Sequence, residues 1–205
     1  METIISSNVK SIYKMGVFKR SFIIWLTFQA ILFLTFGIAF YFNPDAWNTI
    51  SEAAYTITSL NNSIFRSFLA IVGNNLILFS LIIIGNMFVR FGVITPGLLI
   101  LLIQGIIIGY VAGSNSFEFP FASVAEANFQ YLRVGLWETT AYALICAVTM
   151  TKTLHIADSF PAKQWTAVRK LREINFSIAE RIIVLISVLL LITAGYIEAI
   201  DIASI

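Results

Sequence analysis

Residues 21–42 read SFIIWLTFQA ILFLTFGIAF YF and contain no charged side chain over 22 consecutive positions. An α-helix that crosses about 30 Å of hydrocarbon needs about 20 mostly apolar residues. The stretch is longer than the apolar region of a secretory signal peptide, and no small-residue cleavage pattern follows it. It therefore predicts a membrane-spanning helix.

Four more stretches of similar length and hydropathy follow this one. They lie at about 67–89, 94–111, 131–150 and 182–200. The least apolar of them is 131–150, because it contains Arg133 and Glu138. We therefore expect residues 1–205 to form a single transmembrane domain of the all-α class. This domain is a polytopic membrane helical bundle with five transmembrane helices, plus short interfacial amphipathic helices.

The composition also indicates a membrane protein. Of the 205 residues, 59% are hydrophobic and 12% are charged, whereas soluble domains are about 45–50% apolar and about 25% charged. The single cysteine, Cys146, and the single histidine, His155, exclude a disulfide within the chain and any ordinary zinc, haem or iron–sulfur site. We therefore expect no metal and no cofactor. The net charge of +2 is too small to indicate nucleic acid as a partner.

The basic residues test this segmentation independently, because cytoplasmic loops of membrane proteins carry an excess of lysine and arginine. Loops 43–65 and 114–130 contain neither residue. Eleven of the 13 basic residues fall on the other side of the predicted membrane: Lys10, Lys14, Lys19, Arg20, Arg90, Lys152, Lys163, Arg169, Lys170, Arg172 and Arg181. The pattern predicts a multi-pass protein of the cell membrane with a cytoplasmic N-terminus and an external C-terminus.

Three connecting segments place apolar residues on one helical face. They are residues 4–16, 45–57 and 165–178. Helices of this kind lie in the membrane interface, and the first and third segments also carry lysine or arginine that anionic headgroups attract. Each segment either covers an end of the bundle or, for the two basic ones, offers a docking surface to a cytoplasmic partner.

Several polar side chains fall inside the predicted spans, where each is costly unless it faces protein or water. At about 1.5 Å per residue, Asn75, Glu138 and Glu198 lie roughly 21–26 Å from the cytoplasmic end of their spans. Arg133 comes level with Glu198. The candidate site is therefore a polar intramembrane cluster of Asn74, Asn75, Arg133, Glu138 and Glu198.

This cluster allows two interpretations. It handles protons or solutes, or it is a hydrogen-bond network that fixes helix packing. We expect Arg133 to pair with Glu198 or Asp201, and Glu138 to turn to the asparagines at positions 74 and 75. Glu138 is the first candidate for a functional residue.

The third span contains Gly105, Gly109 and Gly113 at intervals of four residues. Small residues at this spacing let the backbone of a neighbouring helix approach closely, and such packing drives helix association in lipid. The three glycines therefore predict a tightly packed helix pair, with a partner in the same chain or in another copy.

The order of these motifs resembles the stage II sporulation protein M family, a group of small multi-pass membrane proteins of bacteria and archaea. Asn75 matches an asparagine of that family, Gly105 and Gly109 match its repeated glycines, and Glu138 and Glu198 match its two acids. Many members carry Pro-His-Gly before the first glutamate, whereas this chain has Arg133–Val134–Gly135. Since sporulation members act in complexes with cell-wall hydrolases, the resemblance implies a complex subunit without enzymatic activity.

Three functions remain open from the sequence. The first is a non-enzymatic integral membrane subunit or scaffold of a larger membrane complex, whose partners are the lipid bilayer and other membrane protein subunits or further copies of the chain. The second is a channel or transporter component that uses the polar layer in the outer half of the bilayer. The third, an intramembrane enzyme, is disfavoured because no nucleophile–base pair can be identified, so we expect no catalytic residue.

Overall fold

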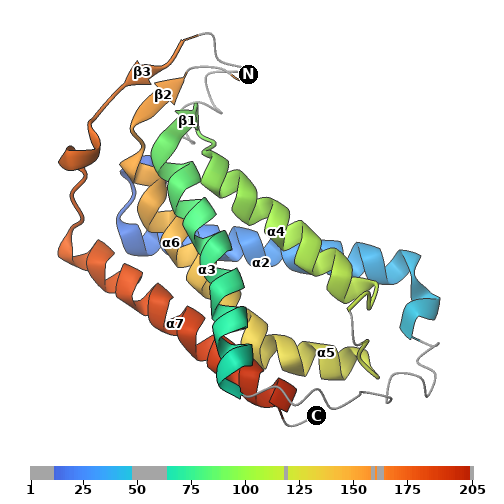
Figure 1. The fold of residues 1–205 in the computed structure, drawn as a ribbon. Coiled ribbons are helices and arrows are strands. Elements are labelled where there is room, and N and C mark those ends of the chain that lie inside the picture. Colours follow the sequence, from blue (N-terminus) through green and yellow to red (C-terminus); the bar gives the residue numbers. More distant parts are fainter. Residues whose placement is uncertain (1–11, 48–63, 118–119, 158–159, 161–163, 204–205) are drawn as a thin grey trace.

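The computed structural model describes residues 12–203 apart from 48–63, 118–119, 158–159 and 161–163. Its main helices pack into a bundle (Figure 1). They are α2 (Val17–Phe42), α3 (Ile64–Phe88), α4 (Pro96–Gly113), α5 (Val124–Gln130), α6 (Leu136–Thr149) and α7 (Ile178–Ala203). Helices α2, α3, α4 and α7 are each long and apolar enough to cross a membrane. The chain is therefore a multi-pass, predominantly helical membrane protein, as the sequence predicts.

The fourth predicted span is not a uniform α-helix. Helix α5 continues without a break into the π-helix η3 (Tyr131–Gly135) and then into α6, and the axis of the run changes direction there (Figure 1). A π-helical turn inserted in an α-helix is a recognised cause of bending. At about 1.5 Å per residue, the 14 residues of α6 alone span only about 21 Å.

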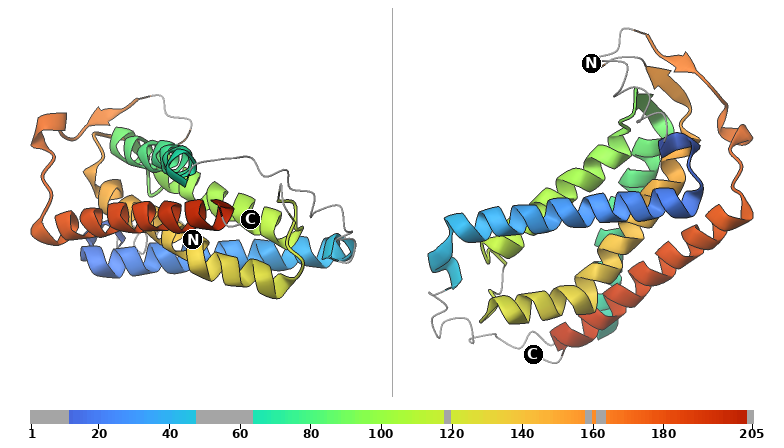
Figure 2. Two further views of the ribbon diagram at one scale, coloured as in Figure 1. Left: turned by 60° about the horizontal axis from the view of Figure 1, so that its bottom comes forward. Right: turned by 180° about the vertical axis from the view of Figure 1, so that it is seen from behind.

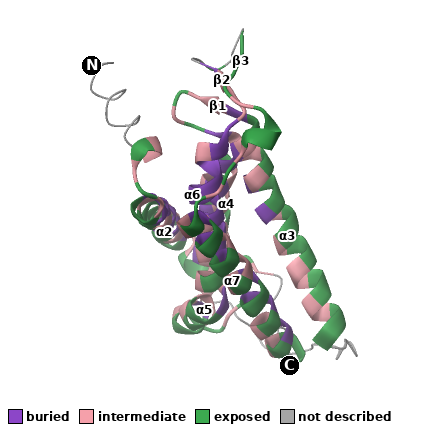
Figure 3. Cartoon of the chain, turned by 90° about the vertical axis from the view of Figure 1, so that its left-hand side faces the viewer, coloured by how far each residue is buried: buried purple, intermediate pink, exposed green. Residues whose placement is uncertain are grey.

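Helix α6 occupies the centre of the bundle. Its residues Ala141, Tyr142, Ala143, Cys146 and Ala147 are completely buried, whereas α3 is largely exposed along its length (Figure 3). A helix enclosed by other helices does not need lipid-like side chains, and its small residues allow close neighbours. This position explains why residues 131–150 are the least apolar of the predicted spans.

The three glycines of α4 pack against α2, so their partner lies in the same chain. A Cβ atom added at Gly109 would overlap the carbonyl oxygen of Leu32 and lie 2.9 Å from Cβ of Thr35. At Gly113 it would overlap the carbonyl oxygen of Phe36. The glycines therefore allow α2 and α4 to pack closely along their length.

A small sheet, which the sequence analysis did not predict, covers one end of the bundle. Strand β1 (Val89–Phe91) pairs in parallel with β2 (His155–Ala157), and β2 pairs antiparallel with β3 (Thr166–Ala167). The turn after β1 requires a glycine, because Gly92 has φ +56°.

The helix predicted for residues 165–178 is wrong. This segment contains β3 and one 3₁₀ turn, η5 (Leu171–Glu173). The backbone N–H of Val168 donates to the carbonyl of Leu154, so pairing with β2 replaces intrahelical hydrogen bonds. Most of the predicted segments 4–16 and 45–57 lies outside the described residues. Their described parts are a helical turn at 12–14 and the 3₁₀ helix η1 (Pro44–Trp47).

We expect Gly109→Leu to destabilise the protein, because the added side chain meets the backbone of α2 directly. Overpacking typically costs about 1–3 kcal/mol, so the melting temperature in mild detergent should fall by about 2–12 °C. Gly37→Leu is the matched control, since a Cβ at Gly37 meets nothing within 4 Å. Equal melting temperatures for the two variants would contradict the packing role.

Candidate functional site

Helices α2 and α7 both begin at one end of the bundle, which we call the basic end. The opposite end is called the acidic end. At the acidic end the predicted pairing of Arg133 is confirmed. Its Nη2 lies 2.6 Å from Oδ1 of Asp201, and Nε2 of Gln130 donates to Oδ2 of the same carboxylate at 3.2 Å. The pair joins η3 to α7. The Arg133 side chain is 45% exposed, which makes this a wetted ion pair of modest strength.

Glu138 does not make the predicted contact with the asparagines of α3. Instead, Oη of Tyr142, one turn along α6, donates to Oε1 of Glu138 at 2.7 Å. Nδ2 of Asn75 is buried without a hydrogen-bond partner among the described residues, and Asn74 is exposed. The prediction was wrong because depth along each span places residues at one level but cannot give their direction around each helix.

Glu198, the other predicted partner of Arg133, does not pair with it, because Arg133 contacts Asp201. Among the described residues it has neither a hydrogen bond nor an ion pair, and the charges of Glu138 and Asp201 both act on it. Both glutamates also lie within electrostatic reach of Tyr142. The structure therefore brings Glu138 and Glu198 together around Tyr142 and leaves Asn74 outside this group.

A second polar contact crosses from α2 to the π-helix and was missed in the sequence. Oη of Tyr131 donates to Oε1 of Gln29 at 2.5 Å, and Nε2 of Gln29 donates to Oγ1 of Thr139 at 3.4 Å. Gln29 is the strongest hydrogen-bonding residue in an otherwise very apolar run. That isolation is the signal that identifies it as inward-facing.

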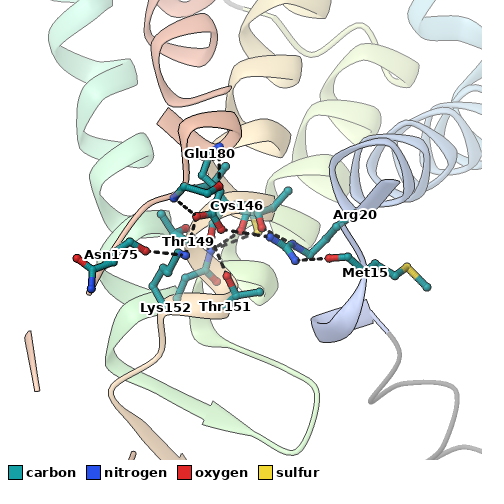
Figure 4. Close-up of polar contacts among 12 residues, drawn as sticks. Met15, Arg20, Cys146, Thr149, Thr151, Lys152, Asn175 and Glu180 are labelled. Carbon is teal, nitrogen blue, oxygen red and sulfur yellow. Dashed lines mark hydrogen bonds and ion pairs between the residues drawn. The ribbon is translucent and has the colours of Figure 1, made fainter. Parts of the chain in front are cut away.

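The basic end contains a buried charge cluster of Arg20, Lys152 and Glu180 (Figure 4). Nζ of Lys152 lies 2.8 Å from Oε2 of Glu180, and Nη2 of Arg20 lies 3.8 Å from Oε1. Nε of Arg20 also donates to the carbonyl of Ala147 at 2.6 Å. The cluster ties together the beginnings of α2 and α7 and the end of α6.

Backbone groups complete the partners of this cluster. The N–H of Ser177 donates to Oε2 of Glu180 at 2.8 Å, and Nζ of Lys152 donates to the carbonyl of Asn175 at 3.0 Å. Ser177 and Glu180 have the spacing of a capping box, which favours the start of α7 there. From the sequence alone Arg20 and Lys152 are expected to be loop charges, because both fall just outside the predicted spans.

A third buried group joins α3, α4 and α6. Asn86 is completely buried; its Nδ2 donates to Oγ1 of Thr149 at 2.8 Å and to the carbonyl of Cys146 at 3.2 Å. Its Oδ1 accepts from Oγ1 of Thr95, the residue that caps α4. Because hydrocarbon offers no alternative partners, these contacts fix the register of three helices.

The described helices also form a lateral groove of about 400 Å³ that is open on one side. It lies between α2 and α7, with α6 as its floor. Its lining residues are Phe18, Ser21, Phe22, Trp25, Leu136, Thr140, Leu144, Ile183 and Ile186.

Over the described part of the chain, no three His, Cys, Asp or Glu residues lie close enough together to hold a metal ion. His155 is in β2, edge-on to Phe88 and near Trp165. Its Nδ1 lies 3.2 Å from the carbonyl of Phe88. The histidine is thus part of an aromatic cluster at the basic end.

Comparisons with protein-family models, with curated proteins and with solved structures returned no match.

We expect Glu180→Ala to be among the most destabilising single changes. It leaves Arg20 and Lys152, whose side chains are 4% and 11% exposed, without their shared counter-charge. Breaking a buried ion pair costs about 3–5 kcal/mol, whereas an exposed pair contributes about 0–1 kcal/mol. The melting temperature in detergent should therefore fall much more than for Asp201→Ala, the matched change at the acidic end. Equal shifts in the two variants would show that the cluster at the basic end is not the stronger tie.

Proposed function

We propose that this chain is a non-enzymatic subunit, or scaffold, of a larger membrane complex. One observation carries the proposal: the docking segment, residues 164–173, starts at the end of α3, where Trp165 contacts Phe88, and then runs along the outside of the bundle (Figure 1). It exposes Trp165, Val168 and Leu171, with exposed fractions of 48%, 45% and 67%. Apolar side chains gathered on a surface outside the membrane spans are typical of interaction sites.

The docking segment is presented to a partner in a fixed form. Its first part is held by the pairing of β3 with β2, and Oε2 of Glu173 accepts from the N–H of Lys170 at 2.9 Å. Three basic side chains, Arg169, Lys170 and Arg172, flank Leu171 in this segment. The complementary partner is a protein surface with apolar pockets and acidic neighbours.

Two further points support a scaffold. The buried charges at the basic end and Asn86 are used in contacts between helices, which gives a rigid frame. The lateral groove is lined mainly by apolar side chains, and neither Glu138 nor Glu198 is among them. The resemblance to the stage II sporulation protein M family points to the same role.

The proposal includes a topology of five membrane crossings with a cytoplasmic N-terminus. The run formed by α5, η3 and α6 provides the fifth crossing. Consecutive helices run in opposite directions across the bundle (Figure 2). The basic end, where β1, β2 and the docking segment lie, faces the cytoplasm, in agreement with the excess of lysine and arginine there.

We expect a cysteine introduced at Ala122 to react with a membrane-impermeant maleimide applied to intact cells. One introduced at Gln164 should react only after lysis. Both positions are exposed, and the native Cys146 is completely buried, so it does not contribute to labelling. Labelling of Gln164→Cys from outside would contradict the proposed topology.

The scaffold role is tested by placing a photo-crosslinking amino acid at Leu171 in cells. We expect crosslinks to a protein of defined mass. The matched control is Leu34, which has almost the same exposed fraction, 66% against 67%, but lies on a membrane-spanning helix and should crosslink only to lipid.

Replacing Arg169, Lys170 and Arg172 together with glutamine should reduce the protein crosslink at position 171, because charge complementarity contributes to the rate of association. Crosslinks to lipid alone at Leu171 would overturn the docking role and show that this segment lies on the membrane surface.

A further inference from the structure

The lateral groove exposes a part of α6 that its neighbours leave uncovered. Leu136, Thr140 and Leu144 recur every fourth residue and so lie on one face of the helix. They form part of the groove lining, between Phe22 on α2 and Ile186 on α7. Most of the other residues of α6 are buried against neighbouring helices.

The length of the groove corresponds to one leaflet of a bilayer. Nε1 of Trp25 donates to Oγ1 of Thr140 at 2.9 Å, which places these two residues at the same level of antiparallel helices. Phe18 lies seven positions from Trp25 on one side of this level, and Leu136 lies four positions from Thr140 on the other. At about 1.5 Å per residue the groove is about 16 Å long, close to half of the roughly 30 Å hydrocarbon core.

This length separates two possible occupants. A partner transmembrane helix spans the full hydrocarbon thickness of about 30 Å and would extend well beyond the groove. An acyl chain that enters from the basic end would fill about half of that. The groove begins at Phe18, in the first turn of α2, and therefore opens at the membrane surface of the basic end.

The hydroxyl of Ser21 gives independent evidence for a ligand with a hydrogen-bond acceptor. Ser21 is only 5% exposed and lines the groove, and its Oγ has no hydrogen-bond partner among the described residues. A buried hydroxyl without a partner is costly. It lies about one turn below the surface, where the ester carbonyl of a membrane glycerolipid offers an acceptor.

Two lysines near the open end of the groove favour a lipid with an anionic headgroup. Lys19 is exposed and follows Phe18 directly in the first turn of α2, and Lys14 is exposed just before it. Lysine near a membrane surface attracts anionic lipid by about 1 kcal/mol per residue.

From these observations we propose that the lateral groove binds one acyl chain of an anionic glycerophospholipid from the leaflet at the basic end. Ser21 donates a hydrogen bond to an ester carbonyl, and Lys19 contacts the phosphate-containing headgroup.

The test is native mass spectrometry of the full chain in mild detergent, titrated with phosphatidylglycerol and, separately, with phosphatidylcholine. We expect one phosphatidylglycerol to bind more tightly than the others, with a preference of about fivefold over phosphatidylcholine. Lys19→Gln should remove most of this preference.

Two variants separate the groove from ordinary lipid contact. Leu144→Trp fills the groove and should weaken the tightest site about tenfold or more. Ile77→Trp, at a position on α3 that is 61% exposed, is the matched control and should leave that site unchanged. Ser21→Ala should weaken the site about two- to tenfold without lowering the melting temperature, because it removes a buried hydroxyl that lacks a partner.

The proposal is overturned if wild type retains no specific lipid, or if Ser21→Ala and Leu144→Trp bind phosphatidylglycerol as wild type does. It is also overturned if Leu144→Cys forms a disulfide between copies of the chain in membranes, which would identify a second copy as the occupant.

Discussion

Hydrocarbon supplies no hydrogen-bond partners, so each polar group inside the bundle must find its partner in the protein. This constraint accounts for the central place of α6, which belongs to the least apolar of the predicted spans. Asn86 reaches it from α3, Arg20 donates to its backbone from α2, and Gln29 contacts its Thr139. The other helices supply the apolar surface that α6 lacks.

The two ends of the bundle satisfy this constraint to different degrees. At the basic end Glu180 is shared by Arg20 and Lys152, and hydrogen bonds to backbone groups complete the cluster. At the acidic end Arg133 compensates only Asp201, while Glu138 relies on a hydroxyl and Glu198 has no partner among the described residues. The basic end is therefore the more firmly fixed, and it also carries the docking segment.

The sequence alone predicted the features that depend on composition and periodicity. These include the long apolar helices, the glycine stripe of α4 and the pairing of Arg133 with an acid near the end of the last span, for which Glu198 and Asp201 were both candidates. It could not predict contacts that depend on the direction of a side chain around its helix axis. For this reason the partner of Glu138 was predicted on α3, whereas it is Tyr142 on α6. It also missed the buried cluster at the basic end, since the rule that places lysine and arginine in cytoplasmic loops cannot distinguish a solvated charge from one drawn into the bundle.

The lateral groove follows from the same glycines that hold the helices together. Gly109 and Gly113 draw α2 onto α4, and Gly195 draws α7 onto α3, where an added Cβ would lie 2.7 Å from Cγ2 of Val72. The first contact holds α2 beside α4, and the second holds α7 beside α3. Helices α2 and α7, which both neighbour α6, therefore do not close over it. The gap between α2 and α7 is the geometric result, and it exposes the face of α6 that carries Leu136, Thr140 and Leu144. Since an empty apolar groove forfeits the dispersion contacts of its lining, a lipid chain that fills it supplies the contacts that the protein's own helices leave unmade.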